Sequence, residues 1–422
     1  MLRPSIPRRV LLASLTAGGG HHALRDSFHA VLRRVDPDHR QFEPVVWTSA
    51  DRLVDRFYAL CVRYLPRFQG TVVELSSQAW AIDLAMRLNP QLLSEASALL
   101  AAQRFDLLVS THPLQSIVFA RARRTLGLST PLVCAVPDYG APPGGYYPPS
   151  AELRPDALIV LDEGTLEHFR SEGVPEKQMH LSGFLTREEF VQAGVRARTE
   201  GRDGLRAELR TIVAEAHPEF ATFALDRPTV LFLGGSAWTA KTEPVLRWVL
   251  EDEGLRQALN VLVVCGKDAA FEARLRARAG DGLHAFGFVS PRVLSSLMAM
   301  ADLPVLGSLA PATLQELLEV GLGPLLLFHF IPGSEQPHVS YIENQRLGVY
   351  EPQPAQMVQL IRQALGLSPI SARLALVRDG YRERARLLRT RSVERAYQLP
   401  RFFERLALAP VSVARDEGAA AG

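Results

Sequence analysis

Continuous apolar runs and amphipathic stretches alternate through the second half of the chain. The runs at 261–264 and 325–328 are apolar at every position, which is typical of strands covered on both faces of a parallel sheet. We predict strands at 229–233, 260–265, 283–289, 303–306 and 324–330, and helices at 239–252, 271–279, 292–301, 313–320 and 339–346. Short connections between alternating strands and helices predict a doubly wound parallel sheet.

The first half shows the same alternation less regularly. A strand at 9–17 precedes a helix whose apolar stripe is spaced to pack on a sheet. Later strands are predicted at 44–47, 107–110, 131–136, 157–161 and 180–182. The charged, helix-prone stretch 196–226 has no strand pattern, so we expect the connection between two domains there.

The predicted fold class is therefore α/β, with two Rossmann-like domains. A chain of 422 residues exceeds one ordinary core, which also favours two domains. We predict a first domain at 1–195, the interdomain connection at 196–226, a second domain at 227–385, and a C-terminal helix with a frayed tail at 386–422.

Composition excludes several classes of protein. Hydrophobic residues make up 47% and charged residues 22%, which is typical of a globular chain, and the net charge of +2 gives no reason to expect nucleic acid. The cysteines Cys61, Cys134 and Cys265 lack metal-ligand spacing, and their odd number argues against a disulfide framework, so a reducing cytosol fits. No apolar stretch reaches the roughly 18 residues that span a bilayer, so we expect any membrane contact to be peripheral.

Two glycine turns each follow a predicted strand and precede a predicted helix. The first is Gly18-Gly19-Gly20 followed by His21, and the second is Gly234-Gly235-Ser236. A helix that opens after such a turn presents free backbone N–H groups, which suits phosphate or a developing oxyanion. Neither turn has the dinucleotide-binding pattern G-x-G-x-x-G, which argues against a dehydrogenase. One turn in each half predicts two ligand-binding ends that face one cleft.

The order of motifs resembles the family-28 glycosyltransferases, and within them the monogalactosyldiacylglycerol synthase and processive diacylglycerol glucosyltransferase branch. The resemblance covers about residues 8–365 and implies the GT-B fold. It is carried by Gly18–His21, Thr111-His112-Pro113, Asp138 after a strand, Gly183 with Arg187, Gly234–Ser236, and Ile331-Pro332-Gly333 near a glutamate.

The resemblance implies that the first glycine turn, Gly18 to Gly20, faces the acceptor and the scissile sugar–phosphate bond. His21 would lie near the reacting centre, and Asp138 could take the proton from an acceptor hydroxyl. The alternatives are a structural histidine and an aspartate that merely caps a turn or helix.

For the donor, Gly235 and Ser236 would hold the diphosphate through backbone amides, and Arg187 would add a fork of donors. The resemblance further implies that the backbone at Phe288 and Val289 recognises the base. It also implies that Thr313 opens the helix on which Glu316 holds the ribose hydroxyls, and that Glu335 touches the sugar. Alternatively, Arg187 is a surface arginine and Glu316 an exposed helix residue.

Two departures from the family's pattern fall in the donor-sugar region. Ala310-Pro311 replaces paired glycines, and Ser334-Glu335 followed by His338 replaces Gln-Glu followed by Asn. Glycine allows the closest approach of backbone to a ligand, so these departures leave the donor sugar, and activity itself, open.

The segment 52–68 places aromatic and aliphatic residues on one helical face between arginines, a pattern that suits a lipid interface. Periodicity alone favours a helix that packs on the sheet, and the resemblance moves the hypothesis toward an acceptor-side membrane contact. The segment 399–406 is a second candidate, or a terminal helix that docks back across the domains.

We therefore expect a UDP-sugar-dependent hexosyltransferase that acts on diacylglycerol or a related lipid, peripheral on the cytoplasmic face of the membrane. No metal and no cofactor besides the nucleotide-sugar substrate is expected, and the oligomeric state stays open. One rival is a UDP-sugar 2-epimerase of the same fold, which needs no lipid. Another is a noncatalytic protein that binds nucleotide-sugar or lipid.

Overall fold

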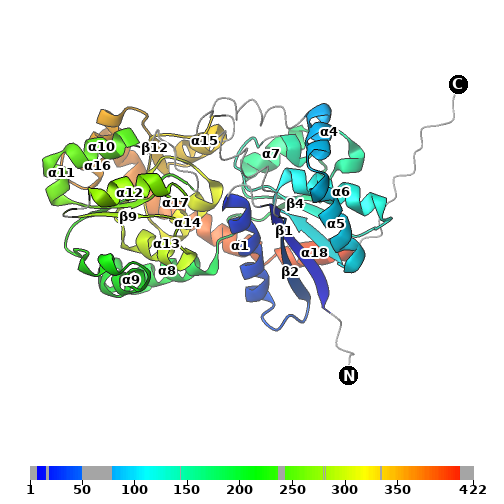
Figure 1. Ribbon diagram of the computed structural model, residues 1–422. Helices are drawn as coiled ribbons and strands as arrows, with labels where there is room; N and C mark the ends of the chain where they lie inside the picture. The colour runs from blue at the N-terminus through cyan, green and yellow to red at the C-terminus, as the bar shows by residue number, and fades with distance from the viewer. Residues whose placement is uncertain are drawn as a thin grey trace.

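The computed structural model describes residues 7–15, 19–49, 78–142, 144–235, 243–278, 280, 282–332 and 335–408. Its first half is built on a six-stranded parallel sheet in the order β2-β1-β3-β4-β5-β6 (Figure 1). These strands are β1 (Arg8–Leu15), β2 (Phe42–Ser49), β3 (Leu107–Ser110), β4 (Leu132–Ala135), β5 (Ala157–Val160) and β6 (Met179–Leu181). All six were expected within a few residues, and β1 ends at Leu15, two residues before the predicted end.

The second half holds another six-stranded parallel sheet, in the order β12-β11-β10-β7-β8-β9. Its strands are β7 (Thr229–Leu233), β8 (Asn260–Val264), β9 (Leu283–Phe286), β10 (Leu303–Leu306), β11 (Leu325–Leu327) and β12 (Gly348–Tyr350). Two parallel sheets flanked by helices confirm the predicted α/β class with two doubly wound halves. The numerical domain boundaries stay predictions.

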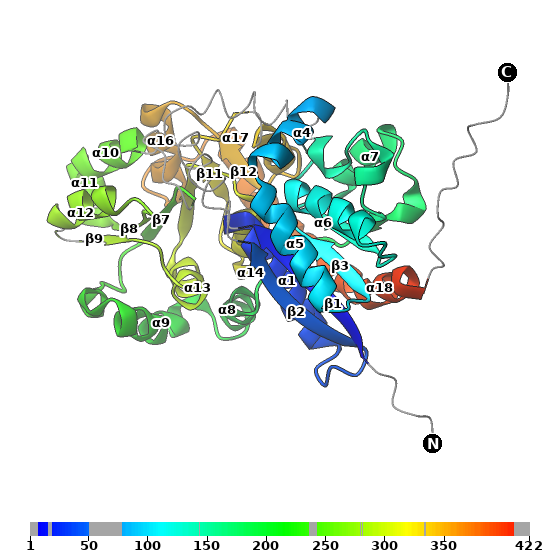
Figure 2. The ribbon, with the colours of Figure 1, turned by 45° about the vertical axis from the view of Figure 1, so that its right-hand side comes forward.

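Helices cover both sheets (Figures 1 and 2). In the first half and the connection they are α1 (Gly19–Val35), α4 (Ala79–Leu88), α5 (Pro90–Ala102), α6 (Pro113–Thr125), α7 (Glu163–Ser171), α8 (Glu188–Thr199) and α9 (Arg202–Ala216). In the second half they are α10 (Glu243–Glu251), α11 (Glu253–Ala258), α12 (Ala269–Ala277), α13 (Pro291–Met300), α14 (Pro311–Val320), α15 (Gln336–Asn344), α16 (Pro354–Ala364), α17 (Ala372–Ala396) and α18 (Leu399–Leu408).

Each sheet has a switch point, where the chain passes from one side of the first strand to the other. In the first sheet it lies between β1 and β3, and in the second between β7 and β10. Ligands of doubly wound folds bind outside the carboxyl ends of the strands at such points. The first glycine turn follows β1 and the second follows β7, so both occupy switch points.

The C-terminal helices reconnect the two halves. Helix α17 runs without a break through the predicted boundary at 385–386, and α18 lies beside β3 of the first half (Figure 2). The Phe403 ring meets Phe42 edge-on at 6.2 Å between centroids, and Phe402 stacks on His180 at 4.7 Å. Segment 399–406 therefore docks across the domains in the described structure, which leaves segment 52–68, outside the described residues, as the remaining sequence candidate for a membrane contact.

Helix starts and strand ends account for most small differences from the sequence prediction. Helices α13 and α14 begin at prolines, one residue and two residues before the predicted starts, because proline suits the first helical turn. Strand β9 ends at Phe286 rather than 289, so the two residues expected to meet the base lie in the following loop.

Candidate functional site

His21 lies in the first turn of α1, at the first switch point. Its Nδ1 faces the carbonyl oxygen of Thr111 in a short hydrogen bond, and the Thr111 hydroxyl donates to the His21 carbonyl at 3.0 Å. Because a carbonyl only accepts, Nδ1 carries the proton and Nε2 keeps a lone pair. Burial lowers the pKa of His21, although the charge of Asp138 and the Thr111 bond oppose this effect. The ring is thus a neutral base with a fixed tautomer.

The glycine turn before His21 is described only in part. Gly18 lies outside the described residues, while Gly19 and Gly20 begin α1. A Cβ added at Gly20 would meet nothing within 4 Å, so the space beside this turn is open.

Asp138 follows β4 and uses both carboxylate oxygens. The Tyr146 hydroxyl donates to Oδ2 at 2.8 Å, and Nε2 of His338 lies 3.4 Å from Oδ1. Burial pushes the pKa of Asp138 up, but the bonds and charge of His338, together with the Tyr146 bond, hold it below its usual value. Asp138 is therefore an ionised carboxylate with one partner at each oxygen.

His338 reaches this carboxylate from α15 of the second half. The side chain is 1% exposed, and its Nδ1 lies 2.9 Å from the carbonyl oxygen of Leu309. Burial opposes its charge, yet the hydrogen bond and charge of Asp138 raise the pKa of His338 above the ordinary value. His338 was noted in the sequence only as a departure where relatives carry Asn.

The loop that carries Asp138 docks directly on α15. Tyr139 stacks on Tyr341 with centroids 4.6 Å apart, and a Cβ at Gly140 would lie 3.2 Å from Cβ of Pro337. Gly140 has φ of 71°, a conformation that suits glycine. The two halves are thus in direct contact at the acceptor-side candidate Asp138.

At the second switch point, Gly235 has φ of 76° and approaches Ser308, whose Oγ would lie 3.2 Å from an added Cβ. Ser236 lies outside the described residues. The Ser308 hydroxyl donates to Oε1 of Glu335 at 2.6 Å, and the Ile331 N–H donates to Oε2 at 2.7 Å. Burial raises the pKa of Glu335, opposed by these bonds. Glu335 therefore braces the loops around this turn.

Arg187 and Glu316 meet across the junction of the halves. Arg187 donates from Nε to Oε1 of Glu316 at 2.9 Å, and its guanidinium lies 4.8 Å from the centroid of Phe190. Burial raises the pKa of Glu316 to about 7, although the charge of Arg187 pulls it downward. The side chain of Arg187 is 19% exposed and that of Glu316 is 4% exposed. The structure thus brings together two residues that were predicted to bind the donor, and they form an ion pair with each other.

The remaining predicted donor residues lie on the rim of the second half. Phe288 is 70% exposed in the loop after β9, and its neighbour Val289 is buried at 9%. Thr313 is half-buried in the first turn of α14. The exposed Phe288 ring is free to stack on a planar base, whereas the Val289 side chain belongs to the core.

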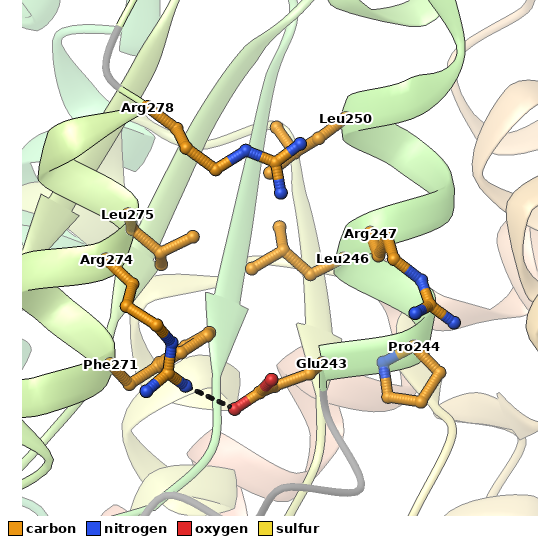
Figure 3. Close-up of a pocket in the computed structure, with 9 residues that line it drawn as sticks. All are labelled: Glu243, Pro244, Leu246, Arg247, Leu250, Phe271, Arg274, Leu275 and Arg278. Carbon is orange, nitrogen blue, oxygen red and sulfur yellow. Dashed lines mark hydrogen bonds and ion pairs between the residues drawn. The ribbon is translucent and has the colours of Figure 1, made fainter.

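A separate cavity of about 310 Å³ lies between α10 and α12 (Figure 3). Its lining combines apolar side chains with three arginines, Arg247, Arg274 and Arg278. Arg274 forms an ion pair with Glu243 at 2.9 Å. None of the predicted site residues lines it. This cavity therefore does not define the candidate site.

In the described ranges, His, Cys, Asp and Glu form no group of three suited to a metal ion. Over the same part of the chain, each helix is too short or too polar to cross a membrane.

The sequence analysis did not identify the residues whose side chains or backbone groups contact the predicted site residues. Ser308 and Tyr146 carry no motif signal, because a serine or tyrosine in a loop is common. Thr111 belongs to the Thr111-His112-Pro113 motif, but no function was predicted for it. His338 lies three residues after Glu335 in the chain. That spacing was the available signal, since it puts His338 in the first turn of α15.

Comparison with known proteins places this geometry in context. No family profile matches the chain. Monogalactosyldiacylglycerol synthase 1 of Arabidopsis thaliana is 23% identical over 398 residues, which cover 88% of this chain and 67% of that protein. The spinach (Spinacia oleracea) monogalactosyldiacylglycerol synthase is 23% identical over 379 residues, which cover 86% and 67%. The chain thus spans about two thirds of the length of these relatives.

Solved structures show the same fold. A UDP-glucosyltransferase from Polygonum tinctorium superposes with a TM-score of 0.57 at 13% identity, covering 96% of this chain and 99% of that one. The UDP-GlcNAc 2-epimerase of Neisseria meningitidis, bound to UDP-GlcNAc, gives a TM-score of 0.55 at 10% identity, covering 92% and 100%. The fold is GT-B, and the findings confirm that the chain resembles the glycosyltransferases of the monogalactosyldiacylglycerol synthase type.

Proposed function

We propose that the protein transfers a hexose from a UDP-sugar to the hydroxyl of diacylglycerol or a related membrane lipid. The observation that carries the proposal is His21 at the first switch point, with its tautomer fixed by Thr111 and a lone pair left on Nε2. The similarity to the plant synthases over most of the chain supports the same reaction class.

In the proposed reaction, His21 Nε2 takes the proton of the lipid hydroxyl as its oxygen bonds to the anomeric carbon. The bond from that carbon to the diphosphate oxygen breaks, and the electron pair leaves with UDP. In this proposal, the backbone amide of Gly235 would receive the diphosphate charge. Donor binding would exchange the Arg187–Glu316 pair for contacts with the diphosphate and the ribose hydroxyls.

The proposed membrane contact lies on α4. Trp80, Leu84 and Leu88 recur every four residues and are 58%, 48% and 60% exposed. Tryptophan with leucines on one exposed face suits the boundary between headgroups and acyl chains, and Arg87 beside them suits anionic headgroups. We assign this face to the inner surface of the cell membrane, with the protein otherwise peripheral.

A lipid-product assay tests the function. Purified protein is incubated with vesicles that contain diacylglycerol and with UDP-glucose, UDP-galactose or UDP-GlcNAc, with and without EDTA. The masses of the lipid products are then determined by mass spectrometry. We expect a lipid heavier by one hexose with at least one donor, and equal rates with and without EDTA. Release of an epimerised sugar without acceptor would support the epimerase instead, and UDP binding without turnover would support a noncatalytic binder.

A further inference from the structure

The contacts of Asp138 do not fit a carboxylate that is waiting for a proton. Oδ2 accepts from the Tyr146 hydroxyl at 2.8 Å, and Oδ1 faces Nε2 of His338 at 3.4 Å. Partners that stabilise the charged form lower the proton affinity of the carboxylate and weaken it as a general base. His21, with its lone pair on Nε2, is the better placed base, so Asp138 serves the reaction in another way.

His338 is enclosed by groups that accept hydrogen bonds or carry negative charge. The loop after β10 presents the Leu309 carbonyl to Nδ1, and the loop after β4 presents the Asp138 carboxylate to Nε2. Glu335, just before α15, adds a second negative charge, and Tyr139 meets the ring edge-on at 5.6 Å.

These partners determine the protonation of the ring. The Leu309 carbonyl requires a proton on Nδ1, and an unprotonated Nε2 would direct its lone pair at a carboxylate. Protons on both nitrogens remove this repulsion and create an ion pair. Only the imidazolium form of His338 therefore attracts Asp138 across the two halves of the molecule, as an ion pair at 3.4 Å.

We propose that His338 is a positioning residue, supplied by the second half, which anchors the Asp138 carboxylate beside His21 when the two halves are docked. This inference rests on the proposed transfer reaction. During transfer, the acceptor proton moves to Nε2 of His21 and makes that ring a cation. The anchored carboxylate stabilises this cation, while Asp138 stays ionised and His338 keeps both ring protons throughout.

Kinetics of three variants test the proposal. With kcat and both KM values measured in the transfer assay, His338→Ala should lower kcat about tenfold to a hundredfold, with each KM within about threefold. His338→Asn, which keeps one donor, should recover part of the loss. The control His168→Asn changes a histidine on α7 outside this cluster and should match the wild type. A raised donor KM with unchanged kcat would make His338 a sugar contact and overturn the proposal.

The pH profile separates positioning from packing. The imidazolium has a raised pKa, so its contribution is present at lower pH and is lost as pH rises through that pKa. The wild type should therefore lose kcat on the alkaline side, and His338→Asn should lack that limb. If His338→Asn loses kcat on the alkaline side as the wild type does, His338 contributes only packing.

Histidine-labelled NMR spectra provide a readout that needs no turnover. At about pH 6, below the ordinary histidine pKa, both ring nitrogens of His338 should be protonated in the wild type, and Asp138→Asn should make the ring neutral. A neutral His338 in the wild type would refute the positioning role. If the wild type transfers no sugar at all, the proposed function fails, and the spectra still decide whether the ion pair exists.

Discussion

At the residue scale, His21 and His338 differ in protonation because their neighbours differ. His21 has one fixed acceptor, the Thr111 carbonyl, so a neutral ring satisfies it. His338 has an acceptor at each nitrogen, so only the charged ring satisfies both. In the proposed reaction, the same residue type would therefore supply a base from one half and a cation from the other.

Substitution of His21 should affect turnover far more than donor binding. His21→Ala should lower kcat about a hundredfold or more, because general base catalysis contributes at least that much, while UDP affinity stays within about twofold. Since burial lowers the pKa of His21, its ring stays neutral below the usual histidine range, and the acid-side loss of wild-type kcat should begin only below about pH 6.5. Initial rates across pH and a UDP titration measure both, and a fully active variant would return His21 to a structural role.

Glu316 should make stability depend on pH. Its pKa is about 7 in the folded protein and 4.5 in a free chain, so the folded state binds more protons between these values. Unfolding free energy should therefore fall by about 3 kcal/mol from this group as pH rises from about 4.5 to about 7. Glu316→Gln should flatten that slope in urea titrations.

The surface carboxyl of Glu343, which pairs with Arg373, supplies the control. Glu343→Gln should leave the pH slope of stability as it is in the wild type. If Glu316→Gln also leaves the slope intact, the charge on Glu316 is not the source of that dependence.

At the element scale, helix α17 fastens the second half to the first. Ser392 accepts from the Phe184 N–H at 2.8 Å, and Arg395 reaches Glu163 at 2.7 Å. This approach is possible because Gly183 has φ of 67° and no side chain, and an added Cβ would lie 2.8 Å from Cα of Ser392.

Gly183→Ala should therefore destabilise the protein by about 2–4 kcal/mol, from backbone strain and the clash with α17. Gly173→Ala is the matched control, because Gly173 has φ of 83° but open space around a Cβ. Gly173→Ala should lower the free energy of unfolding by about 1 kcal/mol, from backbone strain alone. Thermal or urea unfolding measures both, and equal losses would show that α17 does not press on this turn.

The exposed face of α4 should bind anionic membranes. In flotation with phosphatidylglycerol vesicles, Trp80→Glu combined with Leu84→Glu should reduce binding at least tenfold, because charge opposes entry into the interface. Trp248→Glu, at a 48% exposed tryptophan on α10, should bind like the wild type. Equal binding by all three proteins would place the contact elsewhere.

The sequence predicted the helices and strands better than it predicted the contacts between side chains far apart in the chain. Buried strands such as β8 and β11 read directly from apolar runs, because both faces are covered. Strand β12 was not predicted, since three residues give no period, and helices α4 and α5 were not predicted either. His338 and Ser308 act through partners far away in the chain, which no local pattern reveals.

At the scale of the whole molecule, both glycine turns stand at switch points of their sheets, and the halves touch through α1 and α14 as well as through the loop at Asp138. The pairs Arg187–Glu316 and Asp138–His338 both cross this junction. Groups expected to bind the donor and serve the acceptor are thus held in one region by contacts between halves.

The central claim is that this junction binds a uridine diphosphate sugar, and calorimetric titration with UDP tests it most directly. The wild type should release heat with one site per chain, and Gly235→Ala should lose at least tenfold in affinity. Because the positive φ of Gly235 makes this variant less stable, thermal unfolding checks that it is folded at the titration temperature. Binding of UDP by the wild type, weakened in the variant, is the predicted result. The absence of heat with UDP and with every UDP-sugar would contradict the account.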